Sequence, residues 1–155
     1  KGLLAQRPPF PNPKSKIPNP KSMGGFMNDF DKFEDIPAWQ ESMELIRRVY
    51  EHTAEGPWLV DDVLRDELRS TAISIPTKIA KGYGLGEIME FRKSVTSARG
   101  QIFVIKTLLY IAKDLEYLDE AGFDAINAAV ESTLPLIDLL GDNLKRGAFR
   151  RSGNQ

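Results

Sequence analysis

The chain has 155 residues, of which 41% are apolar and 28% are charged, and this is enough for one modest domain with a single core. It has no cysteine and one histidine, His52, which excludes disulfides, thiolate chemistry and histidine-based metal clusters. The most apolar stretch, 102–118, includes four charged residues, so no membrane span is predicted. We therefore expect a cytoplasmic protein without a metal or other cofactor.

The net charge of −1 is the sum of segments of opposite sign. Residues 1–25 carry five basic groups and no acid, and residues 68–113 carry eight basic groups against two acids. Residues 26–67 hold twelve acids and four bases, and residues 114–142 hold eight acids and no base. The overall neutrality therefore hides separate basic and acidic blocks.

The first 32 residues have the composition of an extended arm. Six of the ten prolines fall within residues 1–25, where no periodic apolar pattern occurs. A short repeat, PNPKS, occupies 11–15 and again 18–22. We predict a basic, polyproline-like arm over residues 1–32, which either tethers nucleic acid or serves as a spacer. The spacer is favoured because a Pro-rich arm needs no partner to exist.

Two helices are predicted in the next part of the chain. Pro37 is suited to a first helical turn, and a stripe at 4-3-4 spacing predicts a helix over 37–54, with the apolar residues Trp39, Met43, Ile46 and Tyr50. Asp61 and Asp62 open a second helix, whose stripe is formed by Leu64, Leu68, Thr71, Ala72, Ile75 and Ile79. Pro76 predicts a kink or an interruption in this helix, and the glycines of 82–86 predict its end.

The helix predicted over 87–116 has two apolar sides. One is a seam at alternating spacings of four and three residues, formed by Phe91, Val95, Ala98, Ile102, Ile105, Leu109 and Ala112. The other exceeds the arc that one bundle core covers, and it is formed by Phe103, Val104, Tyr110, Ile111 and Tyr117. Because a helix that is apolar on two sides has to bury both, we predict that this second set forms an oligomer interface.

A fourth helix is predicted after Asp119 and Glu120, with a bend at Pro135 and an end near Gly141 or Gly147. Its apolar side is formed by Phe123, Ile126, Val130, Leu134, Ile137 and Leu140. Four helical segments joined by short loops predict an all-α fold, an up-down antiparallel four-helix bundle over residues 33–146. A basic flexible tail is expected over residues 147–155.

Four cations recur every seven residues along the third helix and form one stripe, here called the cation row: Arg92, Arg99, Lys106 and Lys113. In one interpretation, their stems cover the edge of the core and their charged ends pair with acids of the first and fourth helices. In the other, the row binds phosphates, because within the third helix only Glu87 and Glu90 are available to neutralise it. Extended by Lys78, Lys81 and Lys93, the row is the predicted nucleic-acid site.

The sequence contains no recognisable catalytic arrangement. The glycines of 82–86 lack the preceding strand of a dinucleotide-binding motif, and Glu87 stands where its final glycine belongs. His52 has no assembled nucleophile beside it, and the acid pairs at 61–62 and 119–120 fit helix starts. We therefore expect that the protein is not an enzyme.

Five segments carry a family resemblance: FEDIPAWQ at 33–40, LRSTAISIPTKIAKGYG at 68–84, Glu90-Phe91, Ala98-Arg99-Gly100 and LYIAKDLEYL at 109–118. Over about residues 33–144, the chain resembles the four-helix-bundle proteins encoded in intervening sequences of bacterial 23S ribosomal RNA genes. That family is similar to the accessory variability protein of diversity-generating retroelements, a basic pentameric barrel that works with a reverse transcriptase and its RNA. The resemblance implies a homo-oligomer, commonly a pentamer, without catalytic activity.

The chain departs from the usual pattern of the intervening-sequence proteins in its charge. Where they usually read Asn-Ile-Ala-Glu-Gly, it has Lys78-Ile-Ala-Lys81-Gly, and where they usually carry acids in the third helix it has Val104 and Lys106. These differences favour the basic, retroelement-accessory type.

We therefore expect a non-enzymatic homo-oligomeric bundle that binds RNA or DNA, a reverse transcriptase, or both. The alternative is a protein-interaction scaffold without direct nucleic-acid binding. In that arrangement, the basic helix of one subunit meets the acidic blocks of the next.

Overall fold

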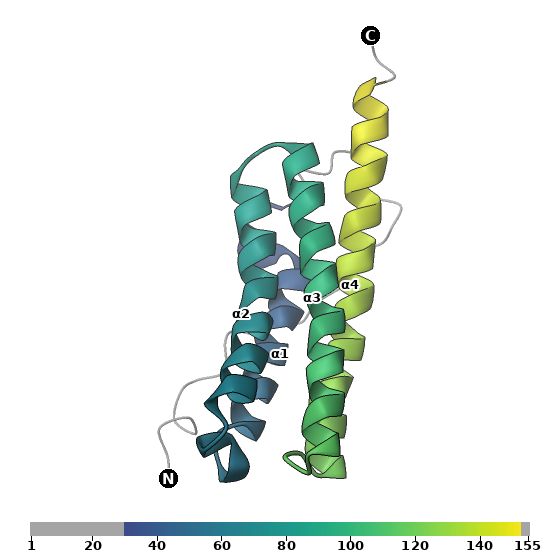
Figure 1. The fold of residues 1–155 in the computed structure, drawn as a ribbon. Helices are drawn as coiled ribbons and strands as arrows, with labels where there is room; N and C mark the ends of the chain where they lie inside the picture. Colours follow the sequence, from purple (N-terminus) through teal and green to yellow (C-terminus); the bar gives the residue numbers. More distant parts are fainter. Residues whose placement is uncertain (1–29, 153–155) are drawn as a thin grey trace.

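A computed structural model describes residues 30–152, with side chains as far as Gly147. Four helices make up the fold: α1 (Pro37–His52), α2 (Asp62–Gly84), α3 (Ile88–Asp114) and α4 (Glu120–Ser152). Two 3-10 helices, η2 (Phe33–Asp35) and η3 (Gly56–Leu59), precede α1 and α2. Each long helix packs on two others, in the order α1–α2–α3–α4 and back to α1 (Figure 1). The predicted all-α, up-down antiparallel four-helix bundle is confirmed, and the predicted arm lies outside the described residues except for 30–32.

The core is formed by the stripes predicted on α2, α3 and α4. Every residue of the predicted α3 seam is buried, and so is every residue of the predicted α2 stripe. On α4, Leu134 is half-buried and the other predicted residues are buried. The alternation of three- and four-residue spacings therefore identified the inward side of these three helices correctly.

The apolar stripe predicted on α1 was wrong by one residue. The buried residues are Ala38, Ser42, Leu45 and Val49, whereas Trp39, Met43, Ile46 and Tyr50 are half-buried at the edge of the core. Ser42 is tolerated inside because its hydroxyl donates to the carbonyl of Ala38 at 2.5 Å. Large aromatic residues with a polar atom favour such a boundary position, where one part of the ring is buried and the other is near water.

The ends of α1 and α2 differ in how they are capped. Pro37 is the first residue of α1, as predicted, but Ile36 stands at the N-cap and no side chain caps the helix. Asp61 caps α2, because its carboxylate accepts a hydrogen bond from the Leu64 amide at 3.0 Å. At the other end α2 ends at Gly84, within the predicted glycine segment 82–86, and the chain reverses at Gly86, whose φ of 72° suits glycine.

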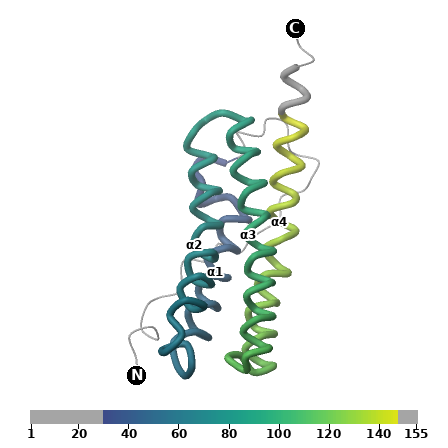
Figure 2. The backbone as a smooth tube through the Cα atoms, viewed as in Figure 1, coloured from purple at the N-terminus to yellow at the C-terminus, as the bar shows by residue number. Residues whose placement is uncertain are grey.

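The predicted breaks at Pro76, Gly141 and Gly147 do not end any helix. Pro76 lies inside α2 and Pro135 inside α4. The predicted end of α4 was wrong: the helix continues to Ser152 and so crosses the boundary predicted at residue 147 (Figure 1). Figure 2 shows the coloured part of α4 as one uninterrupted coil. Neither Gly141 nor Gly147 has the positive φ with which a glycine terminates a helix.

The α3–α4 connection reverses the chain directly after α3. Glu116 adopts the left-handed conformation with φ 59°, and the Tyr117 amide donates to the carbonyl of Ala112 at 2.8 Å. The helical spacing that places Phe103 and Tyr110 on one side of α3 therefore stops before Tyr117.

None of the helices within residues 30–152 is long and apolar enough to span a membrane.

Gly82 allows α2 and α3 to approach closely. A Cβ at this position would lie 2.7 Å from Phe91 Cδ2 and from Ser94 Cβ. Gly82→Ala should therefore destabilise the bundle by about 1–3 kcal/mol, because helix α3 would have to move. Urea unfolding followed by circular dichroism measures this. Gly84→Ala is the control, since no atom lies within 4 Å of its Cβ position and stability should stay equal or rise. Equal stability of both variants would contradict the prediction.

Candidate nucleic-acid and subunit interfaces

Three of the four residues of the cation row are neutralised by acids of α4. Arg99 Nε lies 2.6 Å from Asp138 Oδ1, Lys106 Nζ lies 2.7 Å from Glu131 Oε1, and Lys113 Nζ lies 2.9 Å from Glu120 Oε2. We call these contacts the α3–α4 ion-pair series. The expectation that the row lacks acidic partners was wrong, because its acids come from a different helix. For these three residues, the structure agrees with the interpretation in which the charged ends pair with acids of the fourth helix.

The series has a regular register. A step of seven residues along α3, from Arg99 to Lys106, is matched by a step of seven residues in the opposite direction on α4, from Asp138 to Glu131. Antiparallel helices with the same residue repeat produce this arrangement. Lys113, beside the chain reversal, pairs with Glu120 in the first turn of α4.

Aromatic rings contribute to holding two of these cations. The guanidinium carbon of Arg99 lies 5.1 Å from the centroid of the Phe103 ring, and Lys113 Nζ lies 4.6 Å from the centroid of Phe123. The hydrogen bond to Glu131 is the main cause that raises the pKa of Lys106 above its ordinary value of 10.5. The three cations are therefore paired, with part of their hydrogen-bonding capacity already used.

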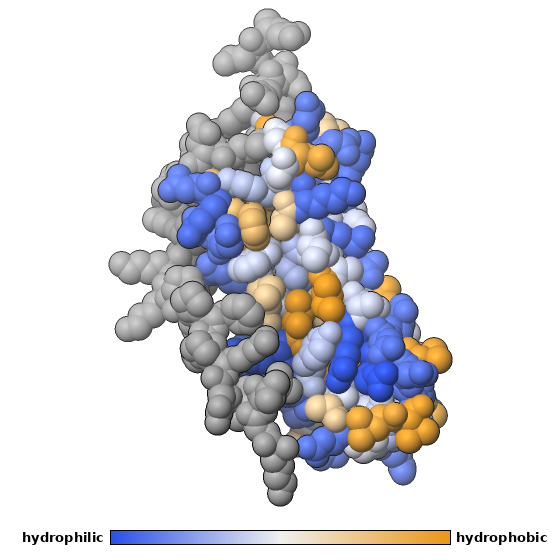
Figure 3. Space-filling model, turned by 90° about the vertical axis from the view of Figure 1, so that its left-hand side faces the viewer, coloured by the Kyte–Doolittle hydropathy of each residue, from blue (hydrophilic) through white to orange (hydrophobic). Residues whose placement is uncertain are grey.

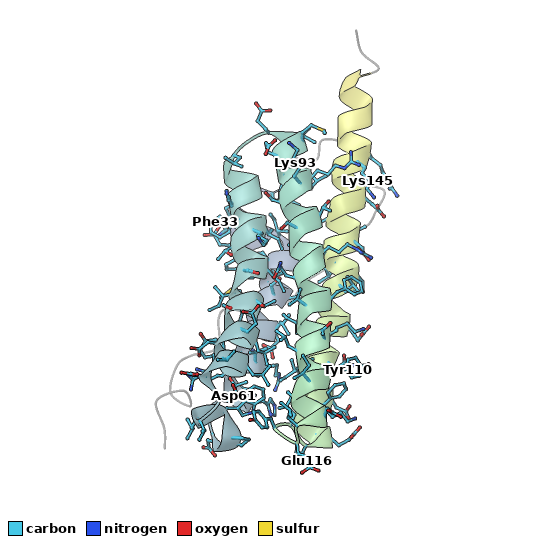
Figure 4. All side chains as sticks on the ribbon, in the orientation of Figure 1. Phe33, Asp61, Lys93, Tyr110, Glu116 and Lys145 are labelled. Atoms are coloured by element: carbon cyan, nitrogen blue, oxygen red, sulfur yellow. The ribbon has the colours of Figure 1, made fainter. Side chains whose placement is uncertain are left out.

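The other predicted nucleic-acid residues lie near the α2–α3 turn. Within the part of the chain that the structure describes, Lys78, Lys81 and Arg92 form no ion pair, and Lys93 pairs with Glu90 at 2.7 Å. Figure 4 shows Lys93 at this end of the bundle, at a height similar to that of Lys145 on α4. The structure thus divides the predicted site into a paired part along α3 and an open part at one end of the bundle.

The predicted oligomer-interface residues on α3 are exposed in the single chain. The exposed fractions are 44% for Phe103, 38% for Val104, 61% for Tyr110 and 41% for Ile111. We call these four residues the apolar face of α3. Tyr110 also packs against the ring of Phe123 at a centroid distance of 5.5 Å, and Figure 4 shows it in the half of α3 nearer to α4's beginning.

Tyr117, the fifth predicted interface residue, does not belong to this face. It follows the chain reversal and packs edge-on against Trp58, with ring centroids 5.5 Å apart. Trp58 Nε1 donates to the Tyr117 carbonyl at 3.1 Å. Burial, with Asp61 nearby, raises the pKa of the Tyr117 phenol. Tyr117 is therefore part of the packing that closes one end of the bundle.

Sequence reasoning missed an apolar patch at that same end. Leu59 at the end of η3, Val60 directly after it and Val63 in the first turn of α2 are 65%, 87% and 78% exposed. Figure 3 shows apolar surface at the lower end of the molecule, where these segments lie. No periodicity marks these residues, because they span the break between two elements, so only their position in the fold identifies the patch.

The family comparison agrees with this architecture. The model of the 23S rRNA-intervening sequence protein family matches residues 34–138, which is more than half of the chain and reaches from η2 into α4. The chain belongs to the 23S rRNA-intervening sequence protein family. Comparison with curated proteins found no match. The matched region of this family member includes the whole α3–α4 ion-pair series and the apolar face of α3.

No group of three or more metal-binding side chains occurs among the residues that the structure describes.

The ion-pair series predicts a charge-swap result. Arg99→Glu should place two carboxylates against each other at Asp138 and destabilise the bundle by about 0.5–1 kcal/mol. Adding Asp138→Arg should restore most of this loss, because the pair is then re-formed with its signs exchanged. Urea unfolding of both variants and of Asp138→Arg alone completes a double-mutant cycle, which measures the coupling free energy between the two side chains. A double variant that is less stable than either single variant would contradict the pairing.

Proposed function

We propose that this protein is a non-enzymatic, cytoplasmic homo-oligomer whose assembled bundles bind nucleic acid and serve a reverse transcriptase as an accessory factor. The observation that carries the proposal is the apolar face of α3, which lies in solvent in the single chain. The retroelement connection rests on the resemblance to the accessory variability protein and on the basic replacements at Lys78 and Lys81, since the third replacement, Lys106, is paired with Glu131.

Burial of the apolar face supports self-association. Its residues are spaced by one, six and one, so they lie on one side of a helix over two turns. Full burial of a large apolar side chain contributes roughly 1.5–3 kcal/mol, so four of them are a substantial reason to associate. Arg99 and Lys106, next to this face, are already neutralised by α4, so a neighbouring subunit meets little uncompensated charge there.

A ring is the form of assembly that the proposal expects. One face that packs on a different surface of the next subunit gives a ring when the rotation closes, and the family resemblance implies five subunits. Each subunit of a ring presents Lys78, Lys81 and Arg92, which form no ion pair within residues 30–147, in an equivalent position. Several weak phosphate contacts on one polymer then act together.

The second candidate is a protein-interaction scaffold without nucleic-acid binding. The observation that favours it is the α3–α4 ion-pair series, which uses three cations of the predicted nucleic-acid site inside the protomer. The nucleic-acid candidate predicts that the protein binds RNA at low salt, and the scaffold predicts that it does not.

The self-association prediction compares two apolar positions. Phe103→Glu should convert the oligomer into protomers of about 17 kDa, because a charge at a buried interface is costly. Val63→Glu is the matched control, since Val63 is more exposed than Phe103 but lies outside the apolar face, and its assembly should be unchanged. Light scattering after gel filtration gives the mass. A wild-type protein that is monomeric at micromolar concentration would contradict the proposal.

Binding of nucleic acid should depend steeply on salt. If several phosphates are contacted, the logarithm of affinity should fall with the logarithm of salt concentration by about 0.9 per phosphate on duplex DNA and about 0.7 on single strands. Fluorescence anisotropy with labelled RNA and DNA between low and physiological salt measures the slope. Absence of binding at low salt would favour the scaffold.

A further inference from the structure

The seven-residue register of the α3–α4 ion-pair series extends one step beyond the Arg99–Asp138 pair, and at that step α4 has no acid. Gly141 lies against Val95, with the Gly141 Cβ position 3.7 Å from Val95 Cγ1, so the antiparallel packing extends past the Arg99–Asp138 pair. Seven residues before Arg99 is Arg92, and seven residues after Asp138 is Lys145. At this step both positions hold a cation, whereas the Arg99–Asp138 and Lys106–Glu131 steps each pair a cation with an acid.

Among the residues that the structure describes, Arg92 forms no ion pair, while Lys145 has a local partner, Asp142, at 3.2 Å on its own helix. An exposed pair of this kind uses one of the three donors of the lysine ammonium and leaves the others available. The step thus offers charge and hydrogen-bond donors to an anion.

The distribution of charge over the bundle leaves a polyanion its less acidic approach at this end. Residues 78–93 and 142–146 hold six cations and three acids, and residues 30–41, at the same end beside α1 and α2, add one cation and four acids. Residues 51–67 and 113–124, at the opposite end, hold eleven acids and two Lys or Arg residues. Asp61 and Glu116 mark that acidic end in Figure 4, and Lys93 and Lys145 mark the other end. A nucleic acid is therefore repelled from the acidic end, whereas the other end carries little net charge and presents the cations of α2, α3 and α4.

We propose that Arg92 and Lys145 bind one phosphate of the nucleic-acid backbone between α3 and α4, with Lys78 and Lys81 along the path of the strand. A guanidinium offers two parallel donors that match the geometry of a phosphate, and the ammonium adds a second charge from the facing helix. Arg99, Lys106 and Lys113 stay with their carboxylates and do not contact the strand. The inference rests on the proposed nucleic-acid function and names the place where it occurs.

One substitution separates this site from general attraction by charge. Arg92→Glu supplies the missing acid opposite Lys145, so the variant should unfold at the same temperature as the wild type or higher. Its affinity for a labelled 20-nucleotide single-stranded RNA in 0.1 M salt should fall about tenfold or more, because a phosphate contact is lost and a repulsive charge is added. Lys145→Glu should behave in the same way and replaces Arg92→Glu if that variant folds poorly.

Arg99→Glu is the matched control. It changes the net charge by the same amount, on the same helix, about 10 Å away. It should lower the unfolding temperature, because it breaks the pair with Asp138, but it should change RNA affinity by less than about twofold if the strand does not contact this step. Equal losses of affinity in Arg92→Glu and Arg99→Glu, or no loss in Arg92→Glu, would overturn the site while leaving nucleic-acid binding in place.

Inorganic phosphate distinguishes failure of the site from failure of the function. If the wild-type protein binds no RNA, but millimolar phosphate raises the unfolding temperature of the wild type and not of Arg92→Glu, then the anion site stands and the nucleic-acid function is rejected. If neither RNA nor phosphate distinguishes the two proteins, both are rejected.

Discussion

The pairing of α3 with α4 through complementary charges determines what the rest of the surface can do. Because the two helices run antiparallel with the same seven-residue repeat, the cations at Arg99 and Lys106 meet the acids at Asp138 and Glu131 in register. Each exposed pair is weak on its own, so its importance lies less in stability than in which charges remain unpaired. The paired cations contribute to packing within the protomer. Lys78, Lys81 and Arg92, which form no ion pair among the described residues, lie at the end of the bundle where the register offers no further acid.

This pairing also gives the two apolar sides of α3 different roles. The inward seam fills the core, while the apolar face borders a strip of neutralised pairs, so a neighbouring subunit can pack there without burying an uncompensated charge. In the proposed assembly, self-association and nucleic-acid binding use different parts of one helix: the middle for subunits and the N-terminal turn with Arg92 for phosphates. The proposed ring would present its cations together without using them to hold the ring.

Much of the fold was predictable from the sequence because the core positions of α2, α3 and α4 repeat at helical spacing. The α1 stripe was predicted one residue late, since Trp39 and Tyr50 are large enough to suggest burial but stand at the edge, while the small Ser42 lies inside. The cation row was recognised, but its acids were not, because Asp138 is 39 residues from Arg99 and only the antiparallel register brings them together. Tyr117 follows Tyr110 by seven residues in the sequence, but it does not lie on the same side of α3, since the helix ends at Asp114 and the backbone turns at Glu116.

In the proposed function, pairing with α4 decides which cations are free to meet nucleic acid. Acetylation of the individual lysines, read by mass spectrometry with and without bound RNA, tests it directly in the unaltered protein. We expect that RNA protects Lys78, Lys81 and Lys145, whereas the modification of Lys106 and Lys113 stays the same with RNA as without it. Protection of Lys106 and Lys113 with no change at Lys145 would contradict it.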